Sequence, residues 1–117
     1  MKKALKKQHK QIELGSGFDH NFVLNEVDSD FVAKVIDENS GRNLEVYTTE
    51  TGVQFYSGNH LKDIEGKGGI LYQKRAAFCL ETQHFPNSPN QSNFPSTLLL
   101  PREKYFSRTT YKFSVGK

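Results

Sequence analysis

The sequence predicts a small all-β protein whose strands pair in antiparallel fashion. Along most of the chain the apolar residues recur with a period of two, as they do in a strand with one buried face. Gly, Asn, Asp, Ser and Pro interrupt these runs at short intervals and supply the turns that antiparallel strands need. The 117 residues, 35% of them apolar, suffice for one small domain and exclude two.

The first strands are predicted in the middle of the chain. In the run 31–36 the residues Phe31, Ala33 and Val35 alternate with Val32, Lys34 and Ile36. Turn residues follow at 38–41, and a second run occupies 44–49. This arrangement predicts a β-hairpin. Short β-rich runs follow at 53–56 and 76–82, and the loop between them is rich in glycine.

The clearest strand is predicted at 108–115, near the end of the chain. Its apolar face is expected to be buried and consists of Thr109, Tyr111, Phe113 and Val115. The segment 83–101 precedes it and holds all four prolines, which cannot donate to a ladder of hydrogen bonds. An irregular crossing is therefore expected there, with at most a short strand at 97–100.

The first ten residues carry five lysines and no acidic residue, which leaves the rest of the chain with a charge of about −2. We interpret residues 1–14 as a flexible, solvated head and residues 15–117 as the domain. Contact of the head with RNA or a membrane is the alternative. No apolar run follows the lysines as in a signal peptide, and no segment approaches the roughly 18 apolar residues of a membrane span. These features predict a cytoplasmic protein without nucleic-acid or membrane partners.

Common signatures of metal, phosphate and nucleophile sites do not occur. The four histidines lie too far apart for a zinc spacing, so no metal is expected. The glycines at 66–69 lack the spacing of a phosphate loop and indicate a hairpin loop. Cys79 has no disulfide partner, and within an apolar run it is expected to be a small buried side chain rather than a nucleophile.

Three polar residues stand where a strand would rarely place them. Asp19 is the first of three polar residues between two phenylalanines, Gln54 interrupts an apolar run, and Glu81 ends one. A carboxyl at such a strand end can be partly desolvated, which raises its pKa and suits it to proton transfer. An Asx turn, an outward-facing amide and a surface carboxylate would explain the same residues. From the residues alone, both interpretations stay open.

The segments that hold these residues resemble the galactose mutarotase, or aldose 1-epimerase, family. The matching strings are GFDHNFVLN (17–25), EVYTTETGVQFYSGN (45–59), FCLETQHFPNSPNQSNFPS (78–96) and KYFSRTTYKFSV (104–115). The resemblance covers about residues 15–116. It implies a large antiparallel β-sandwich, the supersandwich of galactose mutarotases, of which this chain would be the C-terminal third.

The resemblance also implies an isomerase that interconverts the α and β anomers of hexoses such as galactose and glucose without a cofactor. Glu81, in the CLETQ string, falls on the catalytic base of the family, and Asp19 and Gln54 match residues that bind the sugar. The base takes the proton of the anomeric hydroxyl while an acid protonates the ring oxygen. By proximity in sequence, candidate platforms for the apolar face of the sugar are Phe55, Tyr56 and Phe85.

One part of the family pattern has no counterpart in this sequence. The general acid of the family lies upstream in an NxTNHxYFN-like segment, and His20 belongs to the GFDHN string instead. The chain is therefore expected to be truncated and a poor catalyst alone, and to aggregate or to need a partner chain that supplies the missing N-terminal strands. A noncatalytic carbohydrate-binding module that retains Asp19 and Gln54 is the alternative.

Overall fold

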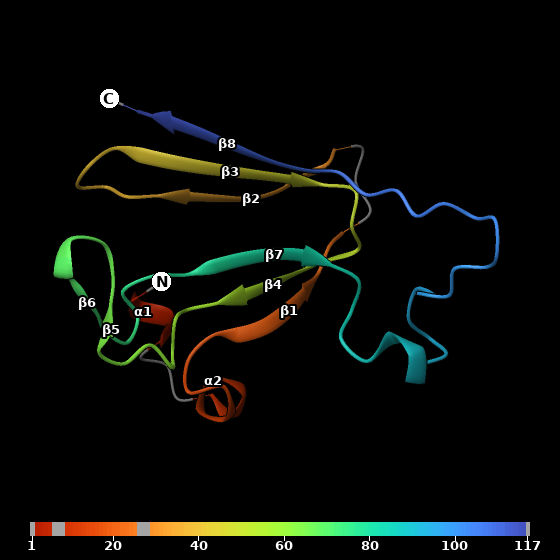
Figure 1. Ribbon diagram of the computed structural model, residues 1–117, viewed down its shortest axis with the longest axis horizontal. Coiled ribbons are helices and arrows are strands. Elements are labelled where there is room, and N and C mark those ends of the chain that lie inside the picture. The colour runs from red at the N-terminus through yellow and green to blue at the C-terminus, as the bar shows by residue number, and fades with distance from the viewer. Residues whose placement is uncertain (1, 6–8, 26–28, 117) are drawn as a thin grey trace. The chain divides into compact units, whose positions relative to one another are not determined.

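Figure 1 shows a computed structural model of the chain, which describes residues 2–5, 9–25 and 29–116. The chain divides into two compact units, one built from Met1–Phe22 and Val53–Glu81 and the other from Val23–Gly52 and Thr82–Lys117. Within the described residues, the strands form two three-stranded sheets and one two-stranded ribbon, and every helix is short. The predicted all-β class is confirmed.

The sheet of the first unit has the strand order β1-β4-β7. Its strands are β1 (Asp19–Val23), β4 (Gly52–Tyr56) and β7 (Cys79–Gln83). Neighbouring arrows in this sheet point in opposite directions in Figure 1. The strands predicted at 53–56 and 76–82 are present, although β7 begins only after the turn at Arg75, where φ is 66°. β1 was not predicted as a strand, because its first three side chains are all polar and fit an Asx turn as well.

A short hairpin and the head complete the first unit. The strands β5 (Ile64–Glu65) and β6 (Leu71–Tyr72) pair in antiparallel fashion around the 3₁₀ turn η1 (Lys67–Gly69), which confirms the predicted hairpin loop. The head contains two short helices, α1 (Lys2–Leu5) and α2 (Lys10–Leu14). The flexibility predicted for 1–14 falls partly on residues 1 and 6–8, which lie outside the described residues.

The sheet of the second unit has the strand order β2-β3-β8 and is antiparallel throughout. Its strands are β2 (Phe31–Ile36), β3 (Arg42–Thr48) and β8 (Thr109–Val115). The predicted hairpin is confirmed, since β2 and β3 pair from Phe31 with Tyr47 to Ile36 with Asn43. As predicted, the segment 83–101 is irregular, with only the short 3₁₀ turn η2 (Ser88–Asn90) among its described elements and no strand at 97–100.

One face of this second sheet is polar. Glu45 on β3 lies between Lys34 on β2 and Lys112 on β8, and its carboxylate forms ion pairs with both at 3.1 and 3.2 Å. Hydrogen bonds from Lys34, Tyr47 and Lys112 lower the pKa of Glu45 to about 2. The charged side chains of Lys34, Glu45 and Lys112 therefore mark the face of the sheet that lies toward solvent.

The other face is apolar, but its burial is uneven. Val46 lies between Ala33 and Tyr111 and is fully buried, whereas Phe113 and Val115, farther along β8, are 76% and 75% exposed. The prediction that this face of β8 is buried was therefore wrong. Alternation shows which residues share a face, and β8, at the edge of its sheet, has that face largely uncovered.

Replacing Val46 with Ala is expected to lower the free energy of unfolding by about 2 kcal/mol, because it removes two buried methyl groups and leaves a cavity. The matched control, Phe113→Ala, removes a larger side chain from an exposed position and is expected to change stability by less than about 0.5 kcal/mol. Urea unfolding followed by circular dichroism measures both. Equal losses for the two variants would mean that Val46 does not mark the core.

Candidate active site

The three candidate residues lie on the three neighbouring strands of the first sheet. Asp19 opens β1, Gln54 is the central residue of β4, and Glu81 is the central residue of β7. The Gln54 Nε2 donates a hydrogen bond to Asp19 Oδ1 at 2.8 Å. The structure thus joins two of the candidates directly and places the third on the next strand.

Ring contacts show which face of this sheet each candidate occupies. Three aromatic rings pack together on one face, with centroid distances of 5.1 and 6.4 Å from the middle ring: Phe18, Phe55 and Phe78. Successive side chains of a strand point to opposite faces. Asp19 and Gln54 are therefore on the face opposite these rings, and so is Glu81, three residues beyond Phe78. We call this the polar face of the first sheet.

The structure separates the three aromatic residues proposed as platforms for a sugar. Phe55 lies on the aromatic face and cannot serve the polar one. Tyr56 shares the polar face with Gln54, and its ring stacks on His60 at 6.3 Å. Phe85 belongs to the second unit, where it packs edge-on against Phe94 at 5.2 Å.

Glu81 and Cys79 are neighbours on β7, two residues apart, and both are exposed in the described chain. The desolvation expected for Glu81 is therefore not observed, and the prediction of a buried Cys79 was wrong. Partial loss of hydration raises the pKa of the Cys79 thiol, and the charge of Glu81 together with a hydrogen bond to its carboxylate raises that pKa further. A thiol that is held protonated in this way is a poor nucleophile.

Sequence reasoning missed one residue of the polar face. Asn21 lies two residues after Asp19 on β1, so both side chains leave the strand on the same side. The signal was the alternation of Asp19 and Asn21 with aromatic residues, for which an Asx turn was one of the interpretations left open. Asn21 thus joins Asp19, Gln54, Tyr56 and Glu81 on the polar face.

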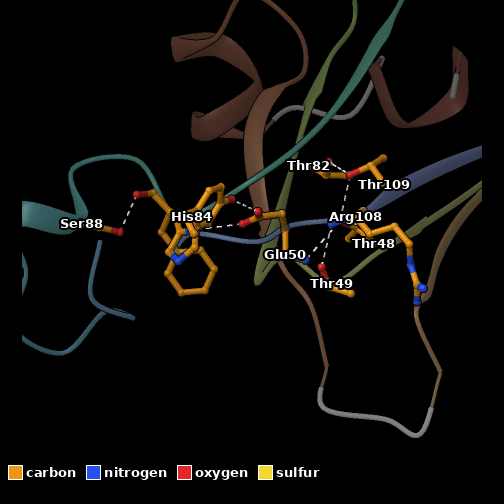
Figure 2. Close-up of polar contacts among 10 residues, drawn as sticks. Thr48, Thr49, Glu50, Thr82, His84, Ser88, Arg108 and Thr109 are labelled. Atoms are coloured by element: carbon orange, nitrogen blue, oxygen red, sulfur yellow. Dashed lines mark hydrogen bonds and ion pairs between the residues drawn. The ribbon is translucent and has the colours of Figure 1, made fainter. Parts of the chain in front are cut away.

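A second polar cluster lies in the second unit and centres on Glu50 (Figure 2). The Glu50 side chain is only 4% exposed, and its Oε2 lies 2.8 Å from His84 Nδ1. Tyr105 donates its hydroxyl hydrogen to Glu50 Oε1. Burial alone would raise the pKa of Glu50, but hydrogen bonds from Ser107 and Tyr105 and the charge of His84 outweigh it and lower that pKa.

Threonine side chains extend this cluster in Figure 2. The hydroxyl of Thr48 donates to the carbonyl of Arg108 at 3.3 Å and lies 3.2 Å from the hydroxyl of Thr109. Thr109 also bonds to Thr82 at 2.5 Å. Sequence reasoning did not single out these residues, which tie the end of β3 to the start of β8. We interpret the cluster as structural.

The lowered pKa of Glu50 predicts a contribution to acid stability. A carboxyl whose pKa is lowered in the folded state contributes stability above its ordinary pKa near 4.5, and this stability is lost as the pH falls through the folded value. Glu50→Gln is therefore expected to flatten the fall in melting temperature below about pH 4.5. Part of the fall in melting temperature should persist in this variant, because the carboxyl of Glu45, with a pKa of about 2, still becomes protonated at low pH. Melts from pH 7 to pH 2 test this, and an unchanged slope in Glu50→Gln would contradict it.

Two features are absent from the described residues. No group of three His, Cys, Asp or Glu side chains in this part of the chain is placed to hold a metal ion. None of the helices described is long and apolar enough to cross a membrane.

Comparisons with known proteins agree on one family. The model of the aldose 1-epimerase family matches residues 2–112. Galactose mutarotases from mouse and human are 50% and 49% identical over 117 aligned residues, which cover 92% of this chain and 34% of each relative. Aldose 1-epimerase from Escherichia coli K12 is 36% identical over 101 residues, 83% of this chain and 29% of that protein.

A solved structure gives the same result at the level of the fold. The GalM/aldose epimerase homologue from C. elegans matches with a TM-score of 0.79 and 26% identity, over 86% of this chain and 30% of that one. The chain spans about a third of the length of the curated relatives it matches. The family match begins at residue 2, so most of the lysine-rich head lies within the matched region.

Proposed function

Because this chain belongs to the aldose 1-epimerase family, we propose that it carries the catalytic base and part of the sugar-binding surface of an enzyme that interconverts hexose anomers. The substrates are hexoses such as galactose and glucose. The observation that carries the proposal is the polar face of the first sheet, where the hydrogen-bonded pair of Asp19 and Gln54 shares one side with Glu81. A carboxylate beside fixed polar groups suits a substrate that is covered with hydroxyls.

In the proposed reaction, the Glu81 carboxylate takes the proton of the anomeric hydroxyl. The electrons of that O–H bond form the aldehyde C=O, the bond between C1 and the ring oxygen breaks, and an acid protonates the ring oxygen. Rotation about the C1–C2 bond turns the other face of the aldehyde toward the ring hydroxyl. Closure reverses the proton transfers and returns Glu81 to its starting state, so no cofactor is consumed.

We propose that the acid comes from a partner polypeptide equivalent to the part of the relatives that this chain does not match. Among the described histidines, His20 alternates with Asp19 and lies on the aromatic side, where its ring is 6.2 Å from that of Phe18. A base working without its acid loses a factor of about 10²–10⁴. The chain alone is therefore a poor catalyst in this proposal.

Polarimetry of fresh α-galactose tests the proposed function. This chain alone is expected to add little to the rate in buffer, whereas the chain mixed with the upstream two thirds of mouse galactose mutarotase is expected to accelerate mutarotation. The upstream segment alone is the control. A mixture no faster than that control, measured after size exclusion has shown a complex, would contradict the catalytic role.

A noncatalytic carbohydrate-binding module is the second candidate function. It is favoured by the Asp19–Gln54 pair, which is already formed in this chain. Saturable galactose binding by the chain, combined with no acceleration in the complex, would select this function over the isomerase.

Asp19→Asn is expected to weaken galactose binding by about 1.5–3 kcal/mol, because the amide replaces a charged acceptor that faces the sugar hydroxyls. Calorimetric titration of the chain with galactose measures the effect. Asp63→Asn, an exposed position in the same unit that bonds Gln73, is the matched control and should bind as the unmodified chain does. Normal affinity together with a much lower melting temperature would assign Asp19 a structural role.

We also propose that the protein works in the cytoplasm on free hexoses, without nucleic-acid or membrane partners. The free, exposed thiol of Cys79 supports this compartment, because reducing conditions preserve such thiols. Cell fractionation tests the location. A filter-binding assay with RNA at rising salt concentrations tests whether the lysine-rich head binds nucleic acid.

A further inference from the structure

Asn21 and Gln54 face each other across the pair formed by β1 and β4. The amide of Ser57 donates to the carbonyl of Phe18 at 2.9 Å, and the amide of Leu24 donates to the carbonyl of Thr51 at 3.1 Å. From Phe18 to Leu24 the first strand advances by six residues, while the bonded partners on the second strand go back by six. The two strands are thus antiparallel. Asn21 and Gln54 are the midpoints of these two segments and lie opposite each other.

The hydrogen-bonding pattern brings these two side chains especially close. In an antiparallel pair, every second pair of opposite residues exchanges no backbone hydrogen bonds and has the shorter distance between side chains. The bonded pairs start at Phe18 with Ser57 and end at Leu24 with Thr51, so Asn21 and Gln54 form a non-bonded pair. Their amides occupy adjoining places on the polar face.

Both amides have a carbonyl oxygen without a donor. Among the described residues, Asn21 Oδ1 and Gln54 Oε1 are buried and have no hydrogen-bond partner, whereas Gln54 Nε2 is held by Asp19 Oδ1. A buried acceptor without a donor costs about 1–3 kcal/mol. Two such acceptors on adjoining strands indicate that this surface is completed by a group with two neighbouring donors.

Resting on the proposed function, we propose that Asn21 and Gln54 form a paired acceptor for two adjacent hydroxyls of the sugar, and that Asn21 thereby determines specificity. A vicinal diol offers two O–H donors on neighbouring carbons, which matches two carbonyl oxygens on neighbouring strands. The last torsions of Asn and Gln are broad, so each oxygen can turn toward a hydroxyl at the surface of the sheet. Asp19 fixes the opposite end of the Gln54 amide.

Calorimetric titration of the chain with galactose and its 2-, 3-, 4- and 6-deoxy analogues tests this inference. Asn21→Leu has a similar volume but no acceptor, and Asn21→Asp keeps an acceptor but has no donor. Asn39→Leu, at an exposed position in the turn between β2 and β3, is the matched control. Thermal melts of all variants accompany the titrations.

Asn21→Leu is expected to bind galactose about tenfold more weakly and to lose the discrimination against one particular deoxy sugar, because that sugar lacks the hydroxyl that Asn21 accepts. Asn21→Asp should retain affinity within about threefold, since its carboxylate still accepts. If Asn21→Leu bound every sugar more weakly by the same factor and also had a lower melting temperature, Asn21 would have a structural role and the inference would be overturned. Equal losses of affinity in Asn21→Leu and Asn21→Asp would overturn it as well. An unmodified chain that binds none of the sugars overturns the proposed function and this inference together. Unchanged binding in Asn21→Leu overturns the inference alone.

Discussion

Glu81→Gln is expected to lower the rate of galactose mutarotation by about 10²- to 10⁴-fold, the usual effect of losing a general base. Gln keeps the size of the side chain and can still form hydrogen bonds, so the loss reports basicity rather than shape. The side chain is exposed on β7, which makes a large effect of the substitution on folding unexpected. Polarimetry on a chimaera that joins the upstream two thirds of mouse galactose mutarotase to this chain gives the rate.

Glu65→Gln is the matched control for that experiment. Glu65 is exposed on β5 in the same unit but lies outside the three-stranded sheet. The rate of this variant should equal that of the unmodified chimaera. If Glu81→Gln kept more than about a third of the rate, the proton would be transferred by another group and the assignment of the base would be wrong.

Glu50→Ala is expected to lower the free energy of unfolding by about 3 kcal/mol, because it removes a buried carboxylate that accepts several hydrogen bonds and leaves their donors without an acceptor. The substitution leaves His84 and the hydroxyl of Tyr105 without their shared acceptor. It also removes the carboxylate that bonds Ser107. Because these groups come from segments far apart in the sequence, their loss should loosen the second unit as a whole.

Urea unfolding monitored by circular dichroism measures this loss. Glu38→Ala, at an exposed position in the turn after β2, is the matched control and should change stability by less than about 0.5 kcal/mol. A loss below about 1 kcal/mol in Glu50→Ala would mean that the cluster contributes no more than an exposed ion pair does.

Local patterns in the sequence predicted the regular strands well. The alternation at 31–36 and 108–115 and the turn residues between β2 and β3 are confirmed. The same reasoning failed at Phe113, because alternation assigns a residue to a face and does not reveal what covers that face. It also did not predict β1, because the polar residues of that strand fit a turn as well as a strand.

The candidate site depended on pairing between distant segments, which a local pattern does not contain. The resemblance supplied Asp19, Gln54 and Glu81 one by one, and the order β1-β4-β7 showed that they share a face. Glu50 was missed for the same reason. In the string TTETG it resembles a surface residue of a turn, and only its pairing with His84, 34 positions later, buries it.

The open end of β8 has a consequence for the amount of this protein in a cell. Phe113 and Val115 present apolar surface on a strand at the edge of its sheet, the kind of surface that chaperones hold and proteases reach. A polypeptide that bound this surface would stabilise the folded chain by mass action, in proportion to the logarithm of its free concentration. The amount of folded chain would then rise with the supply of such a polypeptide, because less of the chain would be open to turnover.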